Sequence, residues 1–140
     1  MNPVFVWPVR VYYEDVDLGG IVYYANYMKF MERARTEWLR AAGIDQLPLK
    51  EQHGLIFAVV ELQTRFRKPA RFDDVLQVSC AVVATARASL TLKQEIHREG
   101  PHGELLLDGD VRIACLDVQT LRPRPLPPQL ASRFNLAGVE

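Results

Sequence analysis

The chain is poor in cysteine, in lysine and in excess charge of either sign. Its two cysteines, Cys80 and Cys115, form no C-x-x-C pair and lie in strand-like segments. We therefore expect buried thiols in a reducing compartment, with no disulfide and no metal site. Acidic and basic residues number 17 each, which argues against a nucleic-acid or anionic-membrane binder. Thirteen of the cations are arginine, and because arginine suits bidentate contact with phosphate or carboxylate, the balanced net charge does not exclude local anion sites.

Long apolar runs are also missing. No stretch approaches the roughly 20 apolar residues that span a bilayer, and residues 1–5 lack the basic and apolar regions of a signal peptide. These absences predict a cytoplasmic protein without a transmembrane segment. A length of 140 residues with 49% hydrophobic residues predicts one domain over 1–140, with a proline-rich tail from about 123 to 140 that runs extended over the surface.

Apolar spacing changes along the chain from strand-like to helical and back. Apolar residues three and four apart predict one helix that begins at Tyr27, with Asn26 as its N-cap and Gly43 as its stop. Strands are predicted at 4–14, 55–67, 75–87, 89–98 and 105–118, with a hairpin turn at 100–103. Short connections favour antiparallel neighbours in chain order. The predicted fold class is α+β, with a curved antiparallel sheet wrapped around one long helix and open edges that favour oligomers.

The densest chemical segment runs from Tyr12 to Arg35. It places Glu14, Asp15 and Asp17 at a strand end, before two glycines and the helix start. Backbone N–H groups at a helix N-terminus can stabilise an oxyanion, and a nearby carboxylate can act as nucleophile or general base. This combination suits the hydrolysis of an activated acyl group such as a thioester. A solvated acidic turn that only stabilises the helix start is the alternative.

The string VYYEDVDLGGIVYYANYMKFMERARTEWLR, from Val11 to Arg40, is similar to the signature of the hotdog-fold 4-hydroxybenzoyl-CoA thioesterase family. Within that family it most resembles the YbgC-type acyl-CoA thioesterases associated with the Tol–Pal system. The resemblance extends over Phe5–Asp15, Pro69–Asp74 and Arg122–Pro127, and so covers nearly the whole chain. It implies a hotdog fold, homodimers with a continuous sheet or homotetramers, and active sites at subunit interfaces.

The resemblance also implies particular site residues. The family's catalytic Asp lies in D-x-x-G-[IV]-V-[YF], which matches Asp17 here. We expect an oxyanion site or site lining from the residues that follow: Gly20, Ile21, Val22, Tyr23, Tyr24 and Asn26. Many YbgC-type members carry His where this chain has Tyr24, and relatives that act on aromatic acyl groups can carry Tyr. No cofactor and no metal are expected, since CoA is part of the substrate.

Further candidates come from the helix and from exposed arginines. Glu32 is the second candidate for the base, because some hotdog thioesterases use a helical Glu. Four residues could bind the CoA phosphates, which suit arginine: Arg87, Ser89, Arg122 and Arg124. The resemblance thus implies hydrolysis of acyl-CoA to a carboxylic acid and CoA. The alternatives are a thioesterase directed to acyl carrier protein and a non-catalytic scaffold protein of an envelope-associated complex.

Overall fold

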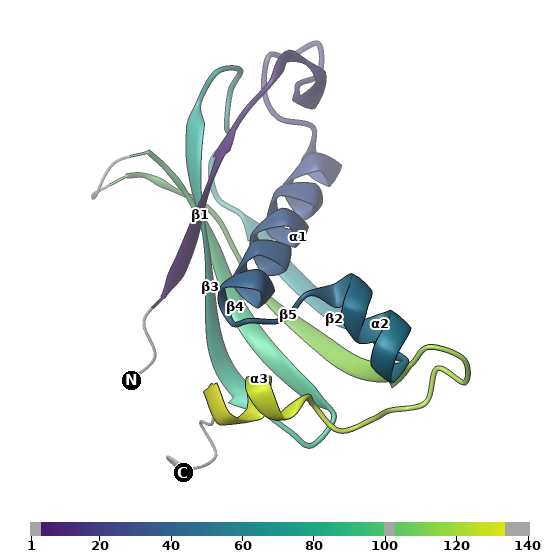
Figure 1. Ribbon diagram of the computed structural model, residues 1–140. Coiled ribbons are helices and arrows are strands. Elements are labelled where there is room, and N and C mark those ends of the chain that lie inside the picture. The colour runs from purple at the N-terminus through teal and green to yellow at the C-terminus, as the bar shows by residue number, and fades with distance from the viewer. Residues whose placement is uncertain (1–3, 100–102, 134–140) are drawn as a thin grey trace.

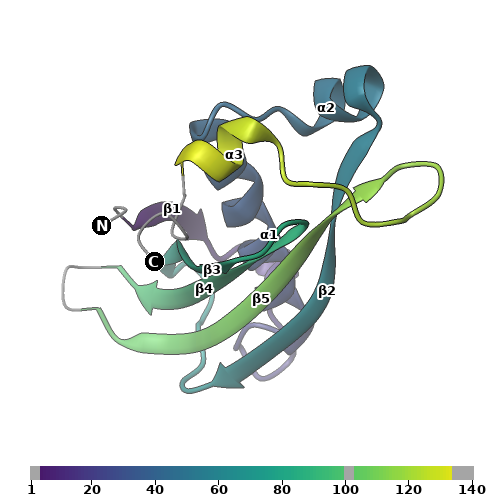
Figure 2. The same cartoon turned by 90° about the horizontal axis from the view of Figure 1, so that it is seen from below.

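A computed structural model describes residues 4–99 and 103–133, without the side chains of 131–133. Five strands form one antiparallel sheet in the order β1-β3-β4-β5-β2 (Figure 1). Their bounds are β1 Phe5–Arg10, β2 Leu55–Phe66, β3 Val75–Thr85, β4 Ser89–Arg98 and β5 Leu105–Asp117. The sheet curves around the long helix α1 (Tyr24–Ala41), and α2 (Gln46–His53) and α3 (Pro128–Arg133) lie on the same side (Figure 2). This arrangement confirms the predicted fold class.

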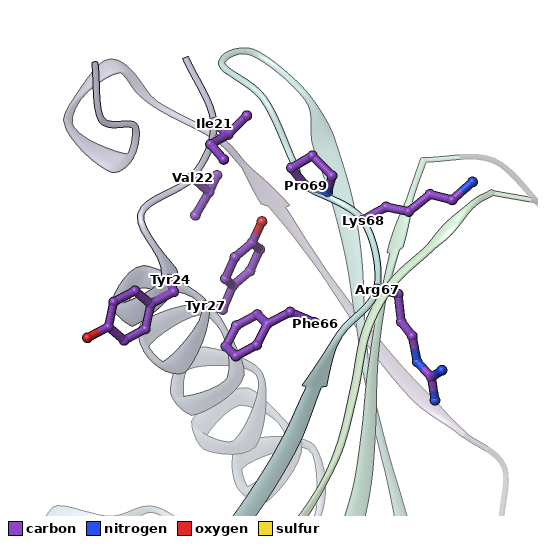
Figure 3. Close-up of a pocket in the computed structure, with 8 residues that line it drawn as sticks. All are labelled: Ile21, Val22, Tyr24, Tyr27, Phe66, Arg67, Lys68 and Pro69. Atoms are coloured by element: carbon purple, nitrogen blue, oxygen red, sulfur yellow. The ribbon is translucent and has the colours of Figure 1, made fainter. Parts of the chain in front are cut away.

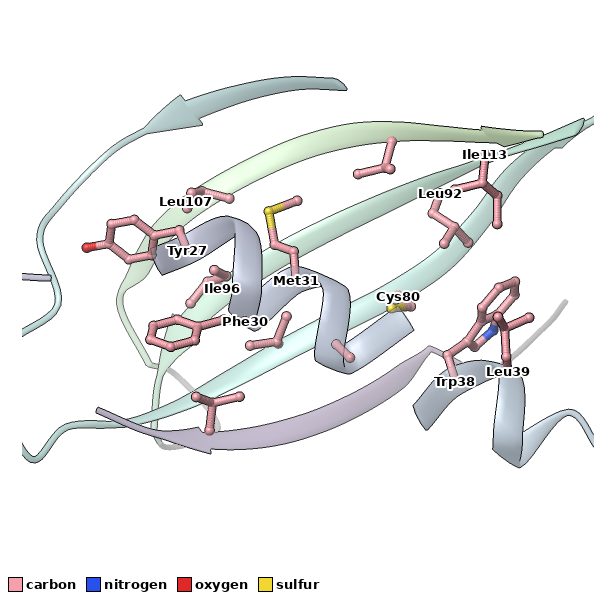
Figure 4. Close-up of a cluster of buried hydrophobic side chains, with 14 of the residues drawn as sticks. Tyr27, Phe30, Met31, Trp38, Leu39, Cys80, Leu92, Ile96, Leu107 and Ile113 are labelled. Atoms are coloured by element: carbon pink, nitrogen blue, oxygen red, sulfur yellow. The ribbon is translucent and has the colours of Figure 1, made fainter. Parts of the chain in front are cut away.

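One face of α1 supplies the centre of the core. The buried residues of the helix recur at spacings of three and four, as the sequence predicts: Tyr27, Phe30, Met31, Ala34, Trp38 and Leu39. They pack against inward-facing side chains of the sheet such as Leu92, Ile96 and Ile113 (Figure 4). Burial of this apolar stripe holds the helix against the sheet.

A buried polar contact also joins α1 to the sheet. Gln94 of β4 is fully buried, and its side-chain N–H₂ donates to the carbonyl oxygen of Met31 at 3.1 Å. Its side-chain oxygen accepts from Arg35 Nη1 at 3.0 Å. Beside it, burial raises the pKa of the Cys80 thiol to about 12. Cys80 and Cys115 are both buried and free, as expected.

The region before α1 differs from its prediction. β1 ends at Arg10 and is followed by a single 3₁₀ turn, η1 (Tyr13–Asp15), so the predicted strand 4–14 is too long. The helix begins at Tyr24 with Tyr23 as its N-cap, three residues before the predicted start. Asn26 is therefore not the N-cap but lies in the first turn of the helix. Its side-chain amide instead donates to the Asp15 carbonyl oxygen at 2.9 Å. The helix stop is confirmed, since Gly43 has a φ of +85° just after the last turn.

Strand neighbours also depart from chain order. β2 pairs with β5 along its length, and not with β3, which lies between β1 and β4. The segment between β2 and β3 makes no hairpin because it crosses over the start of α1, where Ala70 accepts from the Val22 N–H at 2.9 Å. The short helix α2 was not predicted. Its proline, Pro48, lies in the first turn, where a helix does not need that N–H.

The tail lies against the sheet and is not only a surface segment. Arg124 N–H donates to the Cys115 carbonyl oxygen at 2.8 Å, and Leu126 N–H donates to the Arg87 carbonyl oxygen at 2.9 Å. Pro127 is buried, and Leu130 in α3 is 1% exposed within the core. The predicted hairpin turn at 100–103 and the end of the tail, from 134, lie largely or wholly outside the described residues.

Candidate active site

Asp17 begins a tight turn between η1 and α1. Its N–H donates to the Ile21 carbonyl oxygen at 3.0 Å, and the Gly20 N–H donates back to the Asp17 carbonyl oxygen at 3.0 Å. Gly20 has a φ of +76°, which a residue with a side chain adopts only at a cost. The Asp17 side chain is exposed, and Oδ1 accepts from the Gly19 N–H at 2.8 Å. The turn therefore presents a carboxylate to solvent in a defined position.

Asp15 has a different, structural environment. It is 8% exposed, and Oδ2 accepts from the Tyr12 N–H at 2.8 Å. Its carbonyl oxygen accepts from the Tyr23 N–H at 3.0 Å, as well as from the Asn26 side chain. These contacts fasten the Asp15 main chain to the start of α1. Asn26 thus holds the loop to the helix, and does not line the pocket described below.

The first turn of α1 leaves an N–H group unused. The Tyr23 N–H donates to Asp15 and the Asn26 N–H donates to the Tyr23 carbonyl oxygen at 2.8 Å. Within the described ranges, no protein oxygen accepts from the Tyr24 N–H. The helix dipole makes this end of an 18-residue helix partly positive. Such a group can stabilise a developing oxyanion.

A pocket of about 320 Å³ lies beside this turn, between the start of α1 and the end of β2 (Figure 3). Three predicted site residues, Ile21, Val22 and Tyr24, line it. The remaining lining residues come from α1, from the end of β2 and from the segment after it: Tyr27, Phe66, Arg67, Lys68 and Pro69. Because the Asp17 main chain is bonded to Ile21, the carboxylate and the pocket belong to one local structure.

Aromatic side chains form much of the pocket wall. The ring of Phe66 lies 6.4 Å from that of Tyr24 and 5.7 Å from that of Tyr27, centre to centre. The ring centres of Tyr23 and Tyr24 lie 4.9 Å apart. A side-chain hydrogen bond with Tyr24 raises the pKa of the Tyr23 hydroxyl. The sequence assigned Tyr27 only to the core stripe and gave Phe66 no role, because the pocket joins residues about 40 positions apart.

The two cations of the pocket are paired with carboxylates. Arg67 Nη2 lies 3.1 Å from Asp108 Oδ2, and Lys68 Nζ lies 2.8 Å from Glu104 Oε2. The hydrogen bond from Arg67 lowers the pKa of Asp108, and the bond from Lys68 is the largest cause of the lowered pKa of Glu104. These ion pairs largely neutralise the charge at this side of the pocket.

The four CoA-binding candidates gather at the opposite end of the sheet. Arg87 and Ser89 flank the turn between β3 and β4, and Arg122 and Arg124 lie on the tail beside it. At about 3.3 Å per residue, the 11-residue strand β3 places roughly 35 Å between this turn and the end next to the Asp17 loop (Figure 1). Arg87 and Arg122 are exposed, Ser89 is buried, and Arg124 Nη1 donates to Asp117 Oδ2 at 2.9 Å. A single subunit does not bring them to Asp17.

Glu32 also lies away from the Asp17 turn. It is exposed, about 12 Å along α1 from Tyr24, and accepts a hydrogen bond from the Thr36 hydroxyl. It lines a separate cavity of about 160 Å³ between α1 and the strands β2 and β5. Within one subunit, Glu32 and Asp17 therefore do not share a pocket.

In residues 4–99 and 103–133, no group of three or more His, Cys, Asp or Glu side chains is arranged to hold a metal ion. Over the same residues, no helix combines the length and the apolar character needed to cross a membrane.

Comparison with known proteins identifies the family. The thioesterase superfamily matches residues 19–104. The acyl-CoA thioester hydrolase YbgC of Escherichia coli O157:H7 is 38% identical over 132 residues, which cover 94% of this chain and 96% of that protein. The acyl-CoA thioesterase YbgC of Haemophilus influenzae is 37% identical over 131 residues, 94% of each chain.

Solved structures agree with this assignment. A probable thioesterase from Bartonella henselae superposes with a TM-score of 0.81 at 30% identity, covering 89% of this chain and all of that one. A mutant 4-hydroxybenzoyl-CoA thioesterase in complex with 4-hydroxybenzoyl-CoA has the same fold, with a TM-score of 0.86 at 21% identity over 94% and 98% of the two chains. The chain therefore belongs to the thioesterase superfamily, has its hotdog fold and is a thioester hydrolase.

Proposed function

We propose that this protein hydrolyses acyl-CoA thioesters to a carboxylic acid and CoA, with Asp17 as its catalytic carboxylate. One observation carries the proposal: the main chain of the exposed Asp17 is hydrogen-bonded to Ile21, and Ile21 lines the same apolar pocket as Tyr24, whose N–H has no protein acceptor among the described residues. The names of the YbgC relatives support acyl-CoA as the substrate. The pocket would receive the acyl group, because apolar walls with few polar groups are typical of ligand sites.

The proposed chemistry needs only these groups. Asp17 either attacks the thioester carbonyl carbon or removes a proton from a water molecule that attacks it. The carbonyl oxygen becomes an oxyanion, which the Tyr24 N–H stabilises. The carbon–sulfur bond then breaks and CoA leaves as a thiolate, which is a good leaving group because thiols ionise near pH 8.5. If Asp17 attacks directly, water then hydrolyses the resulting anhydride.

The CoA candidates support an active oligomer. Since Arg87, Ser89, Arg122 and Arg124 lie far from the Asp17 of their own subunit, CoA would contact both groups only if a second subunit supplied one of them. β2 is an open edge of the sheet and ends at the pocket residue Phe66. It exposes apolar side chains that a second copy could cover: Val59, Val60, Leu62 and Phe66. We propose that two copies join their sheets along β2.

A carrier-protein substrate would need a different surface. Acyl carrier proteins are acidic, so they would favour a ring of unpaired cations around the pocket. Arg67 and Lys68, the two cations that line it, are instead paired with Asp108 and Glu104. This observation favours CoA itself, and a rate with acyl carrier protein that falls steeply with salt would argue the other way.

Thiol release from short aliphatic, long aliphatic and aromatic acyl-CoA tests the proposal. Asp17→Asn keeps the size of the side chain and removes its charge, so we expect it to abolish turnover and leave folding intact. Asp45→Asn changes another exposed aspartate, the N-cap residue of α2, whose side chain makes no capping hydrogen bond, and serves as the control. Wild-type activity in Asp17→Asn would refute the role of Asp17. A folded wild type inactive on every acyl-CoA would favour the carrier-protein and scaffold alternatives.

A further inference from the structure

The hydroxyl group of Tyr27 lies at the pocket, where it accepts one hydrogen bond and donates none to the described residues. The side chain is 4% exposed and leans toward the start of α1, as long helical side chains do. Its ring faces Phe66, and its oxygen points into the space between Val22 and Pro69 (Figure 3). The oxygen accepts a hydrogen bond from the Ala70 N–H at 3.0 Å.

The hydroxyl proton has no such partner. A tyrosine hydroxyl both accepts and donates, yet in the described ranges Tyr27 only accepts. Arg98 and Asp74, the charges that act on this hydroxyl, are bonded to each other. Burial raises the pKa of Tyr27, so the hydroxyl keeps its proton at neutral and mildly alkaline pH. A donor is therefore available inside a largely apolar pocket whose two cations, Arg67 and Lys68, are already paired with carboxylates.

Whether the Tyr27 hydroxyl finds a hydrogen-bond acceptor depends on which molecule occupies the pocket. A pocket of about 320 Å³ has room for water, which can accept the proton when no acyl group is bound. A purely hydrocarbon acyl group would displace that water and leave the donor without an acceptor, which weakens binding. An acyl group with an oxygen at this point would replace the lost hydrogen bond.

We propose that Tyr27 determines specificity by donating a hydrogen bond to an acyl group that carries an oxygen acceptor besides the reacting carbonyl. The inference rests on the proposed acyl-CoA hydrolysis and names the class of acyl group. The reacting carbonyl is not the acceptor, because it must lie against the exposed Asp17, whereas Tyr27 is buried in the pocket wall. The selected class is therefore acyl groups with a hydroxyl or keto oxygen.

Matched pairs of CoA thioesters test this assignment: pentanoyl with 4-oxopentanoyl, and benzoyl with 4-hydroxybenzoyl. We expect wild-type kcat/KM to favour the oxygenated member of at least one pair by about tenfold or more. Tyr27→Phe removes only the hydroxyl, and it should bring that ratio to about one, because the oxygenated substrate loses a hydrogen bond and the hydrocarbon substrate no longer leaves a donor without an acceptor. Equal rates within both wild-type pairs, or an unchanged ratio in Tyr27→Phe, would overturn the proposal.

A control separates specificity from stability. Tyr27→Phe also leaves the buried Ala70 N–H without an acceptor, so it is expected to lower the unfolding midpoint. Val78→Ala, in the core of β3, lowers stability without touching the pocket and should keep the wild-type ratio. If Val78→Ala also lost the ratio, destabilisation would explain the result and the role of Tyr27 would be refuted.

Binding measurements distinguish this proposal from the proposed function. In non-hydrolysable ketone analogues, a methylene group replaces the thioester sulfur of each substrate. Tighter calorimetric binding of the oxygenated analogue to wild type than to Tyr27→Phe would support Tyr27 even if no thiol were released, and only the hydrolysis proposal would then fail. Thiol release together with equal affinities for both analogues would refute the role of Tyr27 alone.

Discussion

The main-chain N–H of Asp17 donates to the carbonyl oxygen of Ile21 at 3.0 Å. This bond closes the turn that joins the residue with the exposed carboxylate, Asp17, to a residue of the pocket wall, Ile21. The turn depends on Gly20, whose φ of +76° belongs to the left-handed region. The position of the Asp17 carboxylate relative to the pocket is thus set by backbone geometry. Substitutions that change this backbone test whether the position matters.

Gly20→Ala should lower activity more than its effect on stability explains. A β-carbon at Gly20 meets no atom within 4 Å, so the cost arises from the backbone, about 1–2 kcal/mol. If the turn relaxes, Asp17 moves, and we expect kcat/KM to fall about 10- to 100-fold. Gly43→Ala is the matched control, with a φ of +85° and equally open space at the far end of α1. Urea unfolding and thiol release check both, and equal activities in the two variants would contradict this prediction.

Arg87 and Arg122 should bind the nucleotide of CoA and not the acyl group. The double variant Arg87→Ala/Arg122→Ala should raise KM for acyl-CoA by about tenfold or more, because charge-assisted hydrogen bonds to phosphate are lost. Acyl N-acetylcysteamine thioesters lack the nucleotide, so their kinetics should not change. Lys50→Ala, an exposed cation on α2, is the control. A rise in KM for both types of thioester would show that the arginines act in another way.

The two open edges of the sheet should differ in their role. Leu62 of β2 is 43% exposed and Val6 of β1 is 44% exposed. Lysine at either position therefore replaces an apolar side chain of similar exposure by a charged one. Leu62→Lys should yield monomers by light scattering and lower kcat/KM at least about tenfold, since the partner subunit leaves the site. Val6→Lys should keep the wild-type mass and activity. Full activity in monomeric Leu62→Lys would mean that one subunit suffices.

The ion pair between Arg67 and Asp108 should make stability depend on acid pH. Hydrogen bonding from Arg67 lowers the pKa of Asp108 in the folded state below its ordinary value of about 3.9. The pair therefore stabilises the fold above that ordinary pKa, and the contribution is lost as pH falls through the lowered value. Arg67→Met should raise the Asp108 pKa in an NMR titration and flatten this part of the unfolding profile. An unchanged Asp108 titration would contradict the assignment.

Local patterns of sequence predicted most of the fold. The spacing of Tyr27, Phe30, Met31 and Ala34 defines the buried face of α1, because an α-helix returns to the same side every three to four residues. Alternating and β-branched segments predicted the long strands β2 to β5 to within a few residues. Consecutive residues also predicted an acidic turn before two glycines, and the resemblance to the hotdog thioesterases singled out Asp17 and Gly20 within it.

Tertiary structure decided how these parts combine. The pairing of β2 with β5, the early start of α1 at Tyr24 and the anchoring role of Asn26 all depend on contacts between segments distant in sequence. The pocket likewise joins Tyr27 to Phe66 and Pro69, which no local pattern connects. The sequence by itself therefore determined the elements and the acidic turn, because both follow from neighbouring residues. Only the folded chain set the pocket and the donor of Tyr27, because the hydrogen bond from Ala70 forms when the segment after β2 crosses over the helix start.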